Sequence, residues 1–130
     1  MLQKLIERLF KELELGIPVL DEQKSFHFKI SGFDIALKEI EPEFYISSPI
    51  GALPEKKKEE FLMHVMKANF LGQGTGGATI GLTESESFLK LSLSLPYEIN
   101  YITFKEHLED FVNYLDYWKK EIIKHEAEIN

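Results

Sequence analysis

Apolar residues at the start of the chain recur at intervals of three and four positions. Six residues follow this spacing: Leu2, Leu5, Ile6, Leu9, Phe10 and Leu13. On an α-helix this spacing places all six side chains on one face. We therefore predict an amphipathic helix over about residues 1–14, ended by Gly16 and Pro18.

After this helix the pattern changes to alternation of apolar and polar residues. Three short runs alternate, at residues 26–30, 33–38 and 43–47. A period of two predicts strands that bury one face and expose the other. The runs are separated by two turn pairs, Ser31-Gly32 and Glu41-Pro42. Together these features predict an antiparallel meander of three strands.

A second helix is predicted over about residues 55–69, after a loop at residues 49–54. Its apolar side chains, from Phe61 to Phe70, are spread around nearly the whole circumference of the helix. A helix at the surface of a protein is normally apolar on one side only. Because the sheet of so small a domain covers one side of this helix, a second subunit is the simplest cover for the other side.

The last third of the chain predicts a β-hairpin followed by a long helix. A glycine-rich loop at residues 72–77 leads into two alternating runs, at residues 78–82 and 89–95. Thr103 and Glu106 have the spacing of a capping box, with Thr103 at the N-cap position. The buried face of the long helix is predicted to consist of Phe104, Leu108, Phe111, Leu115, Trp118 and Ile122.

The predicted order of elements is α-βββ-α-ββ-α, with the helices segregated from a twisted antiparallel sheet. Segregation of this kind is typical of an α+β fold. With 130 residues, 44% of them apolar, the chain fits one domain around one hydrophobic core. We therefore expect a single domain over residues 1–130.

Composition and charge exclude several kinds of function. The chain carries 15 basic and 22 acidic residues, a net charge of −7, which opposes binding to nucleic acid or to anionic membranes. It contains no cysteine, so disulfides, thiol catalysis and cysteine-ligated metals are excluded. No stretch approaches the roughly 20 apolar residues that span a bilayer. We expect a cytoplasmic protein that inserts into no membrane.

No group of residues has the pattern of a catalytic or cofactor-binding site. Gly72, Gly74 and Gly77 match the G-x-G-x-x-G spacing, but here a helix precedes the loop and a strand follows it, the reverse of a dinucleotide site. The four histidines lack metal-ligand spacing, and Glu84 and Glu86 lie at a predicted hairpin tip. We therefore expect no enzymatic activity, no cofactor and no metal site.

The stretch from Lys67 to Trp118 carries several short motifs. They are Ala68-Asn69 at the end of a helix, Gly81-Leu82 in the strand after the glycine loop, Leu95-Pro96 at the end of a strand, and Leu108-Glu109-Asp110-Phe111-Val112 in the last helix. In these motifs, and in the order of its elements, the chain resembles the Tir chaperone (CesT-like) family, which serves type III secretion in Gram-negative bacteria. The resemblance covers essentially the whole chain and is to a class I effector chaperone.

The resemblance implies a two-fold dimer built on the middle helix and the strand after the glycine loop, with pairing to a related chaperone as the alternative. The residues expected at this interface are Phe61, Leu62, Val65, Met66, Asn69, Phe70 and Ile80. It also implies that the protein binds the N-terminal region of one or more secreted effectors in extended form, which keeps that region soluble and competent for secretion. Such a segment would add backbone hydrogen bonds at a sheet edge.

Two surfaces are candidates for contact with the effector. One is the apolar stripe of the N-terminal helix, for which packing on the sheet as core is the alternative. The other is the otherwise polar face of the sheet, where a few apolar residues are less expected. The candidate residues are Leu5, Leu9 and Leu13 on the first surface and Ala36, Ile40, Tyr45 and Phe88 on the second.

Two other functions are alternatives at this point. A regulatory protein that binds a transcription component or the secretion gate would use the same surfaces, and the identity of the partner would separate it from a chaperone. A small-ligand carrier or enzyme would use the glycine loop as a phosphate clamp. A nucleotide-dependent rise in the melting temperature would reveal it, because a ligand that binds the folded state stabilises it.

Overall fold

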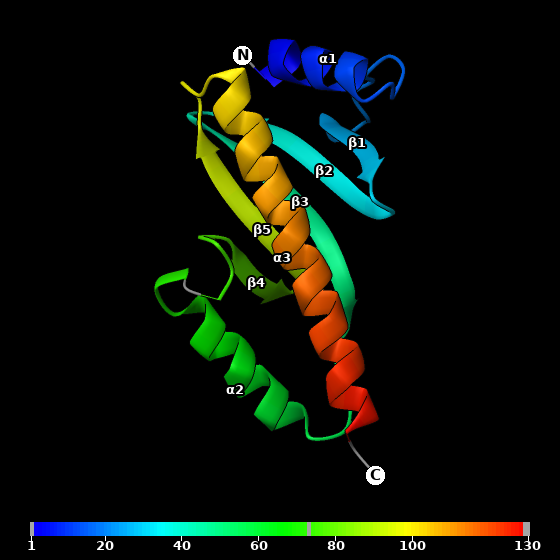
Figure 1. Ribbon diagram of the computed structural model, residues 1–130, viewed down its shortest axis with the longest axis vertical. Coiled ribbons are helices and arrows are strands. Elements are labelled where there is room, and N and C mark those ends of the chain that lie inside the picture. Colours follow the sequence, from blue (N-terminus) through cyan, green and yellow to red (C-terminus); the bar gives the residue numbers. More distant parts are fainter. Residues whose placement is uncertain (1, 73, 129–130) are drawn as a thin grey trace.

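A computed structural model describes residues 2–72 and 74–128 of the chain (Figure 1). Its elements are α1 (Leu2–Glu12), β1 (Ser25–Ile30), β2 (Phe33–Ile40), β3 (Glu43–Ala52), α2 (Lys58–Asn69), the 3-10 turn η1 (Phe70–Gly72), β4 (Thr79–Leu82), β5 (Phe88–Pro96) and α3 (Tyr101–Ala127). This order, α-βββ-α-ββ-α, confirms the α+β fold predicted from the sequence.

The five strands form one antiparallel sheet in the order β1-β2-β3-β5-β4. Helix α3 crosses one face of this sheet, with α1 near its first half and α2 near its second half (Figure 1). On the opposite face the strands carry exposed side chains such as His27, Lys38 and Tyr45. Strands β1 and β4 lie at the two edges of the sheet.

The hydrophobic core lies between α3 and the sheet. Phe104 and Leu115 of α3 are fully buried in one cluster with Phe44 of β3 and Leu91 of β5. Each large apolar side chain buried in this way stabilises the fold by roughly 1.5–3 kcal/mol relative to an exposed one. All six residues predicted for the buried face of the last helix are buried: Phe104, Leu108, Phe111, Leu115, Trp118 and Ile122.

Strand β3 continues past its predicted end and takes up part of the predicted loop at residues 49–54. Pro49 lies opposite Lys90 of β5, and the register shifts between Pro49 and Gly51. The pairing of β2 with β3 extends only as far as Ser47, so beyond this point β3 has β5 on one side alone. Proline is tolerated there because no second strand requires its missing N–H.

Two helix starts also differ from the prediction. Helix α2 begins at Lys58 rather than Glu55, after Lys57 in a left-handed conformation with φ 50°. Helix α3 begins at Tyr101, and Asn100 is its N-cap because its side-chain oxygen accepts a hydrogen bond from the Thr103 N–H at 2.9 Å. Thr103 therefore lies inside the first turn, and its assignment as the cap was wrong. Asparagine is at least as good an N-cap as threonine.

Candidate partner-binding surfaces

Helix α1 buries most of its apolar stripe in the core of the same chain. Leu5 and Leu9 are 9% and 1% exposed, so both side chains belong mainly to the core, which was the alternative for this stripe. Leu13, just after the helix, is 40% exposed. Of the three residues predicted on this surface, Leu13 is the one that offers its side chain to a partner.

A groove of about 220 Å³ lies between the end of α1, the β1–β2 turn and α3, and we call it the α1–α3 groove. Its apolar lining consists of Leu9, Leu13, Ile30, Leu108 and Val112, and its polar lining of Ser31, Lys105, Glu109 and Asn113. An apolar interior with polar groups around it is the usual form of a pocket that receives an apolar side chain and orients it.

A polar cluster fixes α1 against the start of α3, beside this groove. Glu12 accepts hydrogen bonds from the Tyr101 hydroxyl and from the Lys105 ammonium. The Arg8 guanidinium lies over the Tyr101 ring, 4.1 Å from its centroid. The bond from Lys105, and then that from Tyr101, lower the pKa of Glu12. Burial, and then the bond to Glu12, raise the pKa of Tyr101 to about 12. The cluster therefore holds one wall of the groove in place through ionised Glu12 and neutral Tyr101.

The connector between α1 and β1 exposes apolar side chains that the sequence analysis did not select. Ile17 and Val19 are 86% and 73% exposed, and Leu20 is about half exposed. Adjacent exposed apolar residues are less common than single ones and mark interaction sites. The signal in the sequence was the run Ile-Pro-Val-Leu at residues 17–20, directly after the glycine that ends the helical pattern. We call residues 17–20 the apolar connector.

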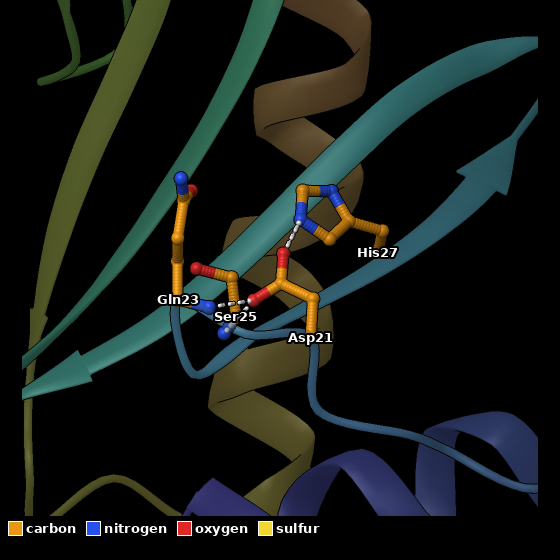
Figure 2. Close-up of polar contacts among 4 residues, drawn as sticks. All are labelled: Asp21, Gln23, Ser25 and His27. Carbon is orange, nitrogen blue, oxygen red and sulfur yellow. Dashed lines mark hydrogen bonds and ion pairs between the residues drawn. The ribbon is translucent and has the colours of Figure 1, made fainter.

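Figure 2 shows how Asp21 anchors the end of this connector to β1. One carboxylate oxygen of Asp21 accepts from the backbone N–H groups of Gln23, at 2.8 Å, and Ser25, at 2.9 Å. The other oxygen lies 2.6 Å from Nε2 of His27. These bonds, with that from Ser25 as the largest cause, lower the pKa of Asp21. His27 therefore has a local structural partner in Asp21.

On the exposed face of the sheet, three of the predicted partner-binding residues lie around one position of β2. Tyr45 is opposite Lys38, and Lys38 lies between Ala36 and Ile40 on the same face. Ile40 and Tyr45 are exposed and Ala36 is half-buried. The structure therefore brings Ala36, Ile40 and Tyr45 together, with a lysine at the centre of the group.

Phe88 does not extend this group. Phe88 pairs with Ala52, whereas Tyr45 pairs with Ser94, so the two aromatic residues lie about 20 Å apart at the usual rise of about 3.3 Å per residue. Phe88 instead borders a separate hollow of about 490 Å³ with Leu53 and Glu126 among its other lining residues.

The residues predicted for the subunit interface lie on α2, η1 and β4 and fall into three groups. Phe61, Val65 and Ile80 are buried in the core of the chain itself. Leu62 and Asn69 are half-buried. Met66 and Phe70 are 71% and 68% exposed, and Met63, which was not selected, is also exposed. We call Met63, Met66 and Phe70 the α2 outer surface. The all-round apolar pattern thus combines a core-facing side with an exposed side.

A cavity of about 540 Å³ lies between α2 and α3, with His64 and Lys67 of α2 on one side and Tyr117 and Trp118 of α3 on the other. The indole N–H of Trp118 donates to the Gly74 carbonyl oxygen at 2.9 Å and is therefore already paired. Within residues 2–72 and 74–128, no group of three or more His, Cys, Asp or Glu side chains is placed to hold a metal ion. None of the helices in these residues has the length and apolar character needed to cross a membrane.

A family model for the Tir chaperone protein (CesT) family matches residues 4–119, from within α1 to within α3. The chain belongs to this family. Three of the motifs that carried the resemblance can now be placed in the structure of this CesT-family protein. Ala68-Asn69 ends α2, Gly81-Leu82 ends β4, and Leu95-Pro96 ends β5. No curated protein sequence gives a significant match to the chain.

Solved structures share the fold of this CesT-family protein at low sequence identity. A chain of the HopA1–SchA chaperone–effector complex has a TM-score of 0.71 and 15% identity, over 91% of this chain and 92% of that chain. A chain of the ExsC–ExsE complex has a TM-score of 0.75 and 10% identity, over 92% of this chain and 91% of that chain. The structure of the Yersinia pestis type III secretion chaperone SycH in complex with a stable fragment of YscM2 matches with a TM-score of 0.70 and 18% identity. The match covers 88% of this chain and 97% of that chain.

Proposed function

We propose that this CesT-family protein is a type III secretion chaperone that binds the N-terminal region of one or more effectors in extended form. The family match over residues 4–119 carries the proposal, and the exposed apolar surfaces support it. Binding would keep the effector segment soluble and competent for secretion. We propose this role for a single domain that acts in the bacterial cytoplasm, without enzymatic activity, cofactor or nucleic acid.

The part of the β1 edge next to the β1–β2 turn is the place proposed for the effector segment. At the other end of β1, Leu20 already pairs with Phe26 and the Asp21 N–H donates to the Ser25 carbonyl oxygen at 3.0 Å. Ser31 and Gly32, with φ 52° and 84°, form the two-residue turn between β1 and β2. In such a hairpin the flanking pair, Ile30 and Phe33, bond to each other, so the backbone of Lys29 points away from β2. An added strand at this edge would lie between the apolar connector and the α1–α3 groove, and alternate side chains would enter the groove.

The α2 outer surface is the proposed contact between two subunits. It consists of two methionines and a phenylalanine that are more than half exposed in the isolated chain. Methionine side chains are flexible and polarizable, and they adapt to an apolar partner surface. We propose a homodimer, and pairing with a related chaperone subunit is the alternative outcome of the same measurement.

The proposed function is tested by isolating the tagged protein from the cytoplasm of its own host and mapping what is bound. Limited proteolysis of the complex should leave one short segment near the N terminus of a secreted protein protected, and deletion of that segment should abolish the complex. Protection of a folded domain instead of a segment would contradict the chaperone proposal. A transcription component as the bound protein would favour the regulatory alternative.

A further inference from the structure

The side chain of Asn69 lies along the free edge of β4. Strand β4 is only four residues long, Thr79–Leu82, and pairs with β5 on one side. An edge strand presents backbone N–H and C=O groups that invite another strand to pair. Asn69, the last residue of α2, occupies the place where such a strand would bond.

Asn69 forms two hydrogen bonds with the backbone of Ile80. Its side-chain nitrogen donates to the Ile80 carbonyl oxygen at 2.9 Å, and its side-chain oxygen accepts from the Ile80 N–H at 2.8 Å. Successive residues of a strand direct their backbone groups to alternate sides, so Thr79 and Gly81 face β5. Leu82 is then the remaining outward-facing position of β4. An added strand would have to displace Asn69 to gain more than this one position.

The glycine loop returns the chain so that Asn69 and Ile80 meet. At Gly74 a Cβ atom would lie 2.7 Å from the Cβ of Ala68, so the loop can approach α2 only with glycine there. The N–H of Gly74 donates to the Ala68 carbonyl oxygen at 3.0 Å, and the Gly74 carbonyl oxygen accepts from the Trp118 indole at 2.9 Å. Gly74 is therefore tied both to the end of α2 and to α3, which fixes the position of the Asn69 side chain opposite β4.

We propose that Asn69 closes the β4 edge against strand addition by acting as a one-residue substitute strand. The closed edge keeps β4 from pairing with the β4 of a second copy. A further consequence, which rests on the proposed function, is that the effector adds its strand at the part of the β1 edge next to the β1–β2 turn, since Leu20 already pairs with Phe26 at the other end of β1. The edge closure itself is a property of the free protein and does not depend on any effector.

The role is specific to asparagine because the two bonds need one donor and one acceptor on a short side chain. An aspartate has the same shape but presents only acceptors when ionised, so it would face the Ile80 carbonyl oxygen without a proton. An alanine offers neither group. Asn69→Ala therefore removes both bonds, and Asn69→Asp removes only the one to the Ile80 carbonyl oxygen. The same substitutions at Asn113, an exposed position of α3, are the matched controls.

The first measurement is amide hydrogen exchange on the purified full chain. In Asn69→Ala, we expect the Ile80 N–H to exchange at least about tenfold faster, because it loses its acceptor. In Asn69→Asp a carboxylate oxygen still accepts from this N–H and only the bond to the Ile80 carbonyl oxygen is lost, so we expect a smaller acceleration there. The Gly81 N–H, which faces β5, should change much less. Unchanged exchange at Ile80 in Asn69→Ala would overturn the proposal that Asn69 closes the β4 edge. Equal acceleration at Ile80 and Gly81 would mean that β4 has simply melted, which would overturn a role confined to the edge.

The second measurement asks whether the opened edge pairs. The chain has no cysteine, so Thr79→Cys places a single thiol on β4. Under oxidation, Asn69→Ala with Thr79→Cys should give at least about threefold more disulfide-linked dimer than Thr79→Cys alone or with Asn113→Ala, because edge strands pair when unprotected. No increase over these controls would overturn edge closure, even if Ile80 exchanges faster. Since neither measurement contains an effector, failure of the chaperone proposal would leave both results standing.

Discussion

Tyr101 donates a hydrogen bond to Glu12, a residue 89 positions earlier in the chain. The bond joins the first residue of α3 to the last residue of α1. Lys105, one turn further along α3, donates to the same carboxylate. This contact sets where the end of α1 lies, and with it the wall of the α1–α3 groove to which Leu9 and Leu13 contribute.

The contact predicts a specific loss of stability at alkaline pH. The pKa of Tyr101 is about 12 in the folded protein and 10.0 for an ordinary tyrosine. A raised pKa contributes stability that is complete below the unfolded value and lost as the pH rises through the folded value. The urea midpoint of the wild type should therefore fall towards that of Tyr101→Phe between about pH 10 and pH 12. A constant difference between the two proteins across this range would contradict the assignment.

Leu9 is expected to act as a core residue. Because it is 1% exposed, Leu9→Ala should lower the free energy of unfolding by about 2–5 kcal/mol, the usual cost of a cavity in a packed core. Leu13→Ala is the matched control, since Leu13 is 40% exposed and should lose far less. Urea denaturation of both variants measures the difference. Similar small losses of unfolding free energy in both variants would show that Leu9 belongs to the groove surface and not to the core.

Leu13→Asp is expected to weaken effector binding with little loss of stability. The substitution places a charge at the rim of the α1–α3 groove, where an apolar effector side chain would have to share the pocket with it. We expect an affinity at least about tenfold lower, which corresponds to roughly 1.4 kcal/mol. Calorimetric titration with the protected effector segment measures this. Ile123→Asp, at an apolar position far along α3 that is 61% exposed, is the control and should bind like the wild type.

Met66→Asp is expected to dissociate the dimer. Met66 is 71% exposed in the isolated chain, and a charge buried without a partner at an apolar interface costs about 2 kcal/mol or more. Sedimentation should show a shift to the monomer while the melting curve of the monomer remains cooperative. Val65→Asp is the instructive contrast, because Val65 is 5% exposed and the same charge there should unfold the chain. An unchanged dimer mass in Met66→Asp would move the interface elsewhere.

The order of elements was predictable because it depends on local periodicity. The helical spacing from Leu2 to Leu13 and the alternation in the five strands each identify a buried face within a few residues. Element ends were less predictable. Pro49 was expected to end β3, but the absence of a second neighbouring strand lets it remain in the sheet. Asn100 replaced Thr103 as the cap of α3, and both residue types suit this position.

The candidate sites were predictable only in part. The apolar character from Phe61 to Phe70 indicated apolar side chains on more than one side of α2, and the structure shows one buried side and one exposed side. It did not show which residues the chain covers itself. Asn69 was selected for the subunit interface, but the structure shows its amide engaged with Ile80 of the same chain. The apolar connector was missed because its residues follow no helical or alternating period.

The sequence by itself determined the fold class, the order of the elements and the lack of cysteine chemistry, because these follow from local spacing and composition. The tertiary structure decided which apolar residues are left for partners. Leu9 and Leu13 lie on one helical stripe, yet only Leu9 is buried, because α3 and the sheet cover the stripe as far as the helix end. The exposure of a residue depends on what packs against it from elsewhere in the chain, and the local spacing of apolar residues does not show this.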